Sequence, residues 1–207
     1  MRVAAILLAA GASRRFGAAD KLLVAIDGVA LVRRSADVLA RSSADPVLAV
    51  VDPDNAAIAR ALDGARATLV ANPRHRAGLG TSIAAGIRAL DSEIDGALVV
   101  PADMPALTTR LIERILAAGV ERQGRAIVHA VDSTGIQRNP VLWPRRHFHR
   151  LAALDGEAGG KAILAAHADA ATAVAADDDH ELDDIDTPEE LAAWTERHLA
   201  TSRPRQP

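Results

Sequence analysis

The fold is indicated most clearly by residues 3–17, which read VAAILLAAGASRRFG. The run Val3–Leu8 is apolar throughout, which is typical of a strand that is buried on both faces. The residues after it are small or basic and include two glycines, as expected for a turn at the end of a strand. In sheets built from such strands, ligands bind beyond the carboxyl ends of the strands. The turn at residues 9–17 is therefore the first place to search for a functional site.

Beyond this turn, short apolar runs alternate with longer segments whose apolar residues recur at helical spacing. Further strands are predicted at residues 47–51, 67–70, 96–100, 125–131, 140–143 and 171–175. Helices are predicted at residues 31–41, 56–62, 82–90, 108–118, 146–154, 160–168 and 188–199. Repeated strand–helix–strand units predict an α/β fold, a three-layer αβα sandwich around a mostly parallel sheet. One domain is expected over residues 1–200, followed by a disordered tail at residues 201–207.

The composition excludes several classes of protein. Of the 207 residues, 49% are hydrophobic and 25% are charged, which is a globular balance. A net charge of -3 and an aromatic content of 2% argue against a nucleic-acid partner, because they supply neither a basic surface nor stacking platforms. The absence of cysteine excludes disulfides and thiolate metal sites. No apolar run approaches the roughly 18 residues of a membrane span, and no basic leader precedes the first run, so a cytoplasmic location without a membrane partner is expected.

Three cations lie in or just after the turn that follows the first strand: Arg14, Arg15 and Lys21. Small residues in such a turn let backbone N–H groups approach a phosphate closely. The glycine pattern of a dinucleotide site and the Gly-Lys-Ser/Thr of a Walker loop are both missing from this turn. Three cations around a small-residue loop suit a triphosphate. The alternative is a surface loop with ordinary arginines.

Two aspartates are candidates for a divalent cation. Asp103 follows the strand predicted at residues 96–100, between prolines that restrict the backbone, and Asp186 directly precedes the last helix. Magnesium takes one or two protein carboxylates and fills its other positions with water and phosphate oxygens. The alternative for Asp186 is a helix N-cap or a turn with Thr187 and Pro188.

A glycine- and hydroxyl-rich loop enters the helix predicted at residues 82–90. Asn72 precedes it, and Gly80 and Ser82 lie within the segment Gly78–Ser82. Such a loop can present polar groups to a base or a ribose, or it can simply cap the helix.

The order of these motifs resembles the molybdenum cofactor nucleotidyltransferase family, and the closest branch is that of the cytidylyltransferases. The resemblance runs from Val3 to about Leu199. It rests on the motifs LAAGASRRFG with a following lysine, GLGTS, DMP and DIDTPEE, and on the segments RNPVLW at residues 138–143 and LDGEAGGK at residues 154–161.

The resemblance implies a Rossmann-like fold of the nucleotide-diphospho-sugar transferase type and assigns roles to particular residues. Arg15, Lys21 and Asp103 would be catalytic, and Asp103 and Asp186 would hold Mg²⁺. The acceptor would contact Asn139, Pro140 and Lys161. The nucleotide would contact Leu8, Ala9, Ala10, Gly11, Ser13, Arg15, Lys21, Asn72, Gly80, Ser82 and Asp103.

The reaction implied by the resemblance is transfer of CMP from CTP to the phosphate of molybdopterin or the molybdenum cofactor, with release of pyrophosphate. A molybdoenzyme or its chaperone would receive the product. Ala10 stands where guanylyl members usually carry glycine, which leaves less room for a purine. Three alternatives remain open: GTP as donor, which Met104 favours, a sugar or alditol phosphate as acceptor, and a non-catalytic carrier of the cofactor. Glu157 and Lys161 replace the family's usual Asp and Arg near the acceptor.

Overall fold

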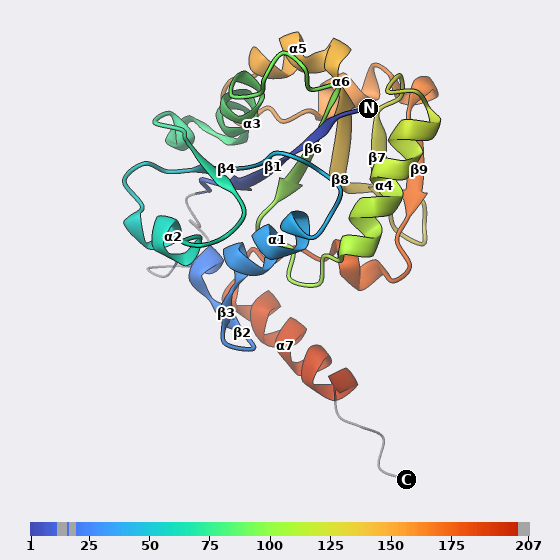
Figure 1. Ribbon diagram of the computed structural model, residues 1–207. Coiled ribbons are helices and arrows are strands. Elements are labelled where there is room, and N and C mark those ends of the chain that lie inside the picture. The colour runs from blue at the N-terminus through green and yellow to red at the C-terminus, as the bar shows by residue number, and fades with distance from the viewer. Residues whose placement is uncertain (12–15, 17–19, 203–207) are drawn as a thin grey trace.

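The computed structural model describes residues 1–11, 16 and 20–202, with side chains up to residue 198. Its middle layer is a seven-stranded sheet in the order β5-β4-β1-β6-β8-β7-β9 (Figure 1). A separate two-stranded hairpin pairs β2 with β3. The strands are β1 (Val3–Ala9), β2 (Ala25–Ile26), β3 (Val29–Ala30), β4 (Val47–Val51), β5 (Thr68–Ala71), β6 (Gly96–Pro101), β7 (Val128–Val131), β8 (Gln137–Pro144) and β9 (Thr172–Ala175).

Helices connect these strands and form the outer layers. The α-helices are α1 (Leu31–Ala40), α2 (Ala56–Ala61), α3 (Leu79–Arg88), α4 (Thr109–Glu121), α5 (Phe148–Ala152), α6 (Lys161–Ala165) and α7 (Pro188–Ser202). Short 3₁₀ segments are η2 (Lys21–Leu23), η3 (His75–Ala77), η4 (Arg145–His147), η5 (Ala168–Ala170) and η6 (Asp179–Leu182). No described helix combines the length and the apolar character that a membrane crossing requires.

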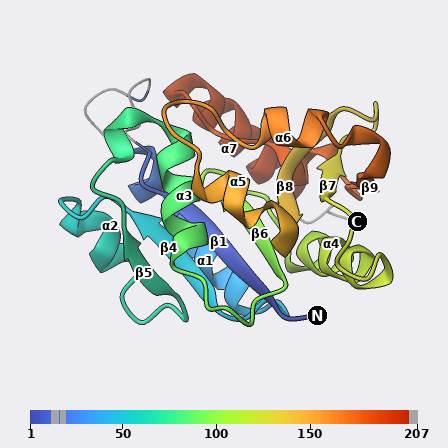
Figure 2. The same cartoon turned by 90° about the horizontal axis from the view of Figure 1, so that it is seen from above.

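Alternation of side chains along the strands builds two cores, one on each face of the sheet. Ala5 and Leu7 of β1 pack against α1, α2 and α4, whereas Ile6 between them packs against α3, α5 and α6. Figure 2 shows the sheet from above with helices on both sides. The predicted three-layer αβα sandwich is confirmed.

One strand of the sheet runs against the others. β8 pairs antiparallel with both β6 and β7, whereas the other pairs in this sheet are parallel. The beginning of β8 therefore lies at the same edge as the carboxyl ends of β1 and β6. Since ligands bind at that edge, residues at the start of β8 can take part in the site.

The last helix packs on the hairpin rather than on the sheet. Trp194 of α7 and Ile185 before it are buried against Ile26 and Leu31. The hairpin turns at Asp27 and Gly28, both with positive φ (52° and 78°), which is the geometry that an Asp-Gly turn adopts.

The predicted elements all occur, but several bounds were wrong. α3 begins at Leu79 rather than at residue 82, because Gly78 with φ of 125° serves as the residue before the helix. β8 begins at residue 137 rather than 140; the pairing with β7 shifts register at residues 129–130, and such an irregularity accommodates Pro140 within the strand. β7 starts at residue 128, α5 and α6 are shorter than predicted, and α7 continues to Ser202 into the segment expected to be a tail.

Candidate active site

Three charged side chains from distant parts of the chain meet at the carboxyl edge of the sheet. The Nζ of Lys21 lies 2.7 Å from Oδ2 of Asp103 and 2.7 Å from Oδ1 of Asp186. The side chain of Lys21 is 11% exposed, that of Asp103 18% and that of Asp186 33%. One ammonium thus donates to two carboxylates in a partly buried place.

Local hydrogen bonds fix Lys21 and Asp103. Asp20 caps η2 by accepting from the backbone N–H of Leu22, and its other oxygen accepts from Asn55, 2.8 Å away, at the start of α2. Asp103 lies two residues beyond β6, where the N–H of Ala102 donates to the carbonyl of Leu8 and so ties the end of β6 to that of β1. The segment of Lys21 is thereby held at the start of α2, and that of Asp103 at the ends of β1 and β6.

Asp186 reaches the same place because its segment is bonded to Asp103 directly. The N–H of the buried Ile185 donates to the carbonyl of Asp103 at 3.0 Å. The start of α7 is capped by Thr187 and Glu190, each of which accepts from the other's backbone N–H. The helix-capping role that sequence left open for Asp186 is therefore filled by Thr187, and the Asp186 carboxylate reaches Lys21.

The electrostatics of the cluster keep Lys21 charged. Burial acts to lower the pKa of Lys21, but the charges and hydrogen bonds of Asp103 and Asp186 outweigh it and raise that pKa above its ordinary value. Burial, together with the charge of Asp103, raises the pKa of the nearby Asp184. Among the described residues, the hydrogen-bonded cluster holds two aspartates and one lysine.

The residues present fit a hard divalent cation. Oδ1 of Asp103 is buried, and among the described residues no hydrogen-bond donor reaches it. A buried carboxylate oxygen without a partner is costly unless a cation or a donor occupies its vicinity. The described chain offers no group of three or more acidic or histidine ligands, so water and substrate oxygens would complete the shell, as magnesium prefers.

A cavity of about 660 Å³ opens beside this cluster. Its walls come from the ends of β1 and β6, from η2, and from the segment between β5 and α3. It is lined by Leu8, Ala10, Gly11, Lys21, Leu22, His75, Arg76, Gly78, Leu79, Ser82, Pro101, Asp103, Glu157 and Asp186.

A second cavity of about 450 Å³ lies over the start of β8. Apolar side chains of the sheet and of α3 and α6 form its floor, and polar side chains stand around it. The polar members are Gln137, Arg138, Asn139, Glu157, Lys161 and Asp184.

The two cavities share a wall. Leu8, Leu79, Pro101 and Glu157 line both of them. Asp103 faces the first cavity and Met104, the next residue, faces the second. A ligand in one cavity therefore lies next to a ligand in the other, beside the Lys21 cluster.

Close backbone packing joins the loop before α3 to the loop before α6. The N–H of Gly80 donates to the carbonyl of Gly156 at 2.9 Å. A Cβ on Gly78 would lie 2.4 Å from the backbone carbon of Gly156, and one on Gly80 would lie 2.5 Å from the carbonyl oxygen of Ala158. Only glycine permits this approach, so these two glycines serve contact between loops.

The residues predicted from sequence fall into three groups. Those that line the first cavity are Leu8, Ala10, Gly11, Lys21, Ser82, Asp103 and Asp186, and those that line the second include Asn139 and Lys161. Those that line neither cavity are Ala9, Asn72, Gly80 and Pro140. Ser13 and Arg15 lie outside the described residues.

The residues behind the cavity wall have structural roles. Ala9 faces the core on the side of α1, as alternation along β1 requires. Asn72 is buried and donates to Thr81 and Ser82 at 3.0 Å each, which fixes the entry into α3.

Sequence reasoning missed several side chains of the two cavities. His75 and Arg76 belong to a basic run, Arg74-His75-Arg76, that follows a strand end and could have been noticed for that reason. In the sequence, Glu157 stands out only as a departure from a motif. Its place in the wall shared by the two cavities depends on the contact between the loops before α3 and α6. Pattern alone does not predict such a contact.

Comparison with known proteins agrees with this geometry. The chain is 30% identical to "Purine catabolism protein PucB" of Bacillus subtilis (strain 168) over 199 residues, which cover 89% of this chain and 92% of that protein. The crystal structure of Rv0371c from Mycobacterium tuberculosis H37Rv superposes with a TM-score of 0.81 at 21% identity and covers 95% of this chain and 98% of its own; a further Rv0371c structure is a complex with manganese. A nucleotidyl transferase from Methanothermobacter thermautotroptrophicus (Mth528) superposes with a TM-score of 0.80 at 20% identity, covering 97% and 99% of the two chains.

Residues 5–171 match the family described as "MobA-like NTP transferase domain". That range includes the loops before α3 and α6, together with Lys21 and Asp103. The chain therefore belongs to the family of MobA-like NTP transferase domains and is a nucleotidyltransferase.

Proposed function

We propose that this chain transfers CMP from CTP to the phosphate of molybdopterin or the molybdenum cofactor and releases pyrophosphate. The observation that carries the proposal is the shared wall between two cavities beside the Lys21 cluster. A group transfer between two substrates requires two adjoining pockets with charge stabilisation where they meet. The product would pass to a molybdoenzyme or its chaperone.

The first cavity suits the triphosphate. Lys21 lines it and supplies a cation that stays protonated at neutral pH, because its pKa is raised. Asp103 and Asp186 would hold Mg²⁺, and a structure of the similar Rv0371c in complex with manganese supports the use of a divalent cation. When bound, such a cation supplies neutralisation of phosphate charge at the reacting phosphorus.

The reaction is a direct displacement. A phosphate oxygen of the acceptor forms a bond to the α-phosphorus of CTP, while the bond from that phosphorus to the bridging oxygen breaks and the electron pair leaves with pyrophosphate. A phosphate nucleophile is already anionic near neutral pH, so the chain needs no general base. Lys21 stabilises the charge that develops on the leaving phosphates, and the cavity walls hold the two substrates in line.

The second cavity suits a phosphorylated heterocycle. Arg138 and Lys161 are cations that can bind the acceptor phosphate, and Asn139 adds an amide that can bond a ring edge. Trp143 and Leu164 supply apolar surface for a flat ring.

The choice of CTP depends on which of the two cavities Ala10 and Met104 line. Ala10 lines the first cavity, where its methyl group restricts the room for a base. Met104, which favoured GTP, lines the second cavity and so contacts the acceptor rather than the nucleotide.

The experiment that tests the proposal combines binding with turnover. The chain is screened by thermal unfolding with each of CTP, GTP, ATP and UTP in the presence of Mg²⁺, and pyrophosphate release is then followed with molybdopterin as acceptor. We expect CTP to raise the melting temperature most and to support release, and Asp103→Asn to abolish release while remaining folded. Release with a sugar phosphate but not with molybdopterin would overturn the acceptor, and preference for GTP would overturn the donor.

A further inference from the structure

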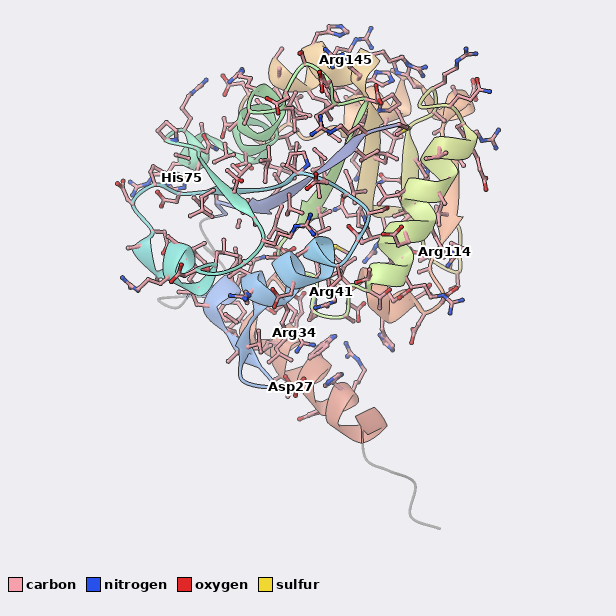
Figure 3. The ribbon with its side chains drawn as sticks, in the orientation of Figure 1. Asp27, Arg34, Arg41, His75, Arg114 and Arg145 are labelled. Atoms are coloured by element: carbon pink, nitrogen blue, oxygen red, sulfur yellow. The ribbon has the colours of Figure 1, made fainter. Side chains whose placement is uncertain are left out.

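His75 contacts the ends of two strands, β1 and β4, in the wall of the first cavity. It lies in η3, between β5 and α3, where Figure 3 labels it. Its Nδ1 lies 3.3 Å from the carbonyl oxygen of Ala10, just beyond β1, and its Nε2 lies 3.3 Å from Oδ2 of Asp52, just beyond β4. The side chain is 9% exposed and lines the cavity. One ring thus bridges the ends of two parallel strands.

The segment that carries His75 is itself held firmly. The N–H of Asn72 donates to the carbonyl of Val51 at 2.9 Å, and the Asn72 side chain accepts from the N–H of Arg74 at 3.0 Å. The hydroxyl of Thr81 lies within hydrogen-bond distance of the carbonyl of Arg74. The backbone that carries the ring is therefore fixed. The contact with the ring accordingly restricts the position of the Ala10 carbonyl.

The bond to Ala10 has a consequence for the residue that follows. In a planar trans peptide the carbonyl of Ala10 and the N–H of Gly11 point in opposite directions. A side chain that fixes the carbonyl therefore fixes the direction of the N–H as well. Ala10 and Gly11 both line the cavity, so the orientation of this peptide determines what the cavity offers to a ligand.

The two ring nitrogens of His75 face different groups. The carbonyl oxygen of Ala10 lies within hydrogen-bond distance of Nδ1, while the carboxylate of Asp52 lies 3.3 Å from Nε2 on the other side of the ring. Arg76 lines the same cavity, and the Arg74 guanidinium is engaged by Asp155. Among the described residues, the other charged side chains of the cavity are Lys21, Asp103, Asp186 and Glu157.

We propose that His75 is a positioning residue of the nucleotide site, which orients the Ala10–Gly11 peptide while Asp52 holds the ring. The inference rests on the proposed function only in that the first cavity binds a nucleoside triphosphate. His75 is part of the wall of that cavity and acts through the peptide that it contacts.

The test measures nucleotide binding separately from turnover. Calorimetry with a CTP analogue, in which a methylene group replaces the oxygen between the α and β phosphates, gives the affinity of wild type, His75→Ala, His75→Gln and Asp52→Asn. We expect His75→Ala to weaken binding about tenfold and His75→Gln about threefold, because glutamine keeps one donor. The KM for the nucleotide should rise by the same factors, with the KM for the acceptor and kcat unchanged. The matched control is His149→Ala, an exposed histidine of α5 that lines neither cavity.

A double variant separates positioning from a general loss of structure. Asp52→Asn combined with His75→Ala should cost no more affinity than His75→Ala alone. Additive losses in the double variant, or nucleotide affinity in His75→Ala equal to that of the control, would overturn the inference and leave the proposed function standing. Failure of the wild type to bind any nucleoside triphosphate would overturn both.

Discussion

Nη2 of Arg74 lies 2.9 Å from both carboxylate oxygens of Asp155, which ties the loop before α3 to the loop before α6. The loop before α3 lines the first cavity through His75 and Arg76, and the loop before α6 lines the second through Gly159 and Gly160, with Glu157 in the wall of both. The hydrogen bond from Arg74 holds the pKa of Asp155 below its ordinary value, so the pair persists at neutral pH. The link provides a physical route by which one substrate can affect binding of the other.

We predict that Arg74→Gln raises the KM for the acceptor about threefold and changes the melting temperature little, because the pair is exposed to solvent. Steady-state kinetics with both substrates varied measures this effect. Arg114→Gln, which breaks a similar exposed pair with Asp177 on the side of α4, is the control. Equal kinetics for the two variants would show that the link has no role in coupling.

Replacing the ammonium of Lys21 should strengthen metal binding while it weakens the metal-free protein. In Lys21→Met, Asp103 and Asp186 lose a cation that bonds both of them, which costs about 2 kcal/mol of stability for partly buried carboxylates. Mg²⁺ should restore that loss, and Mn²⁺ titration followed by electron paramagnetic resonance should give a dissociation constant below that of wild type. Lys161→Met, at the second cavity, should leave the Mn²⁺ affinity unchanged. Weaker Mn²⁺ binding in Lys21→Met would contradict the assignment of these carboxylates.

The methyl group of Ala10 should limit the size of the base. We expect Ala10→Gly to lower the preference for CTP over GTP, measured as the ratio of their kcat/KM values, by about tenfold, the effect typical of one methyl-sized group in a pocket. Ala9→Gly is a matched control, because it removes the same group from an equally buried residue that lines neither cavity. It should reduce stability and leave the ratio as it is. A ratio that moves equally in both variants would remove Ala10 from the specificity argument.

Gly160 approaches the ring of Trp143 too closely for any side chain. A Cβ there would lie 2.4 Å from Cζ2 of the indole, so Gly160→Ala should cost about 1–3 kcal/mol and displace the tryptophan. Urea unfolding and tryptophan fluorescence measure the two effects. Gly159→Ala is the control, since its Cβ would meet only the flexible end of Leu79 at 3.3 Å. Comparable losses in both variants would show that the indole is free to move.

We expect the free energy of unfolding to decrease in acid because of His147. Burial, and then the charge of Arg146, lowers the pKa of His147 from 6.5 to about 4. The folded protein therefore holds the neutral ring, and the stability it contributes is complete above pH 6.5 and is lost as the pH falls toward 4. The loss should approach about 3 kcal/mol. Urea unfolding at a series of pH values should show a smaller decline in His147→Gln, and parallel declines in the two proteins would count against this origin.

The layered fold follows from the sequence because the buried strands are continuous apolar runs. Val3–Leu8 and Val47–Val51 carry no polar side chain, and only a sheet covered on both faces buries such runs. The β2–β3 hairpin received no prediction, since two residues per strand give no period to detect. Its stability depends on packing against α7, more than 150 residues away, which local pattern cannot reveal.

Sequence predicts those site residues that are charged and lie near the end of a buried strand. Asp103 and Lys21 are charged residues beside a buried strand end, and the structure brings them together with Asp186. Their hydrogen bonds could not be predicted, because they depend on the bond between Ile185 and Asp103 that positions the last segment. His75 was missed for a similar reason, since its two partners, Ala10 and Asp52, lie just beyond two other strands.

The reversed direction of β8 places the turn of the β7–β8 hairpin, residues 132–136, next to Gln137, which lines the second cavity. A hairpin tip tolerates insertions, because changes in its length leave the pairing of the strands intact. A change in the length or the side chains of this one turn would reshape the second cavity and leave the first, whose walls come from the ends of β1 and β6, from η2 and from the segment before α3, as it is. The fold thereby allows one cavity to vary while the other is kept.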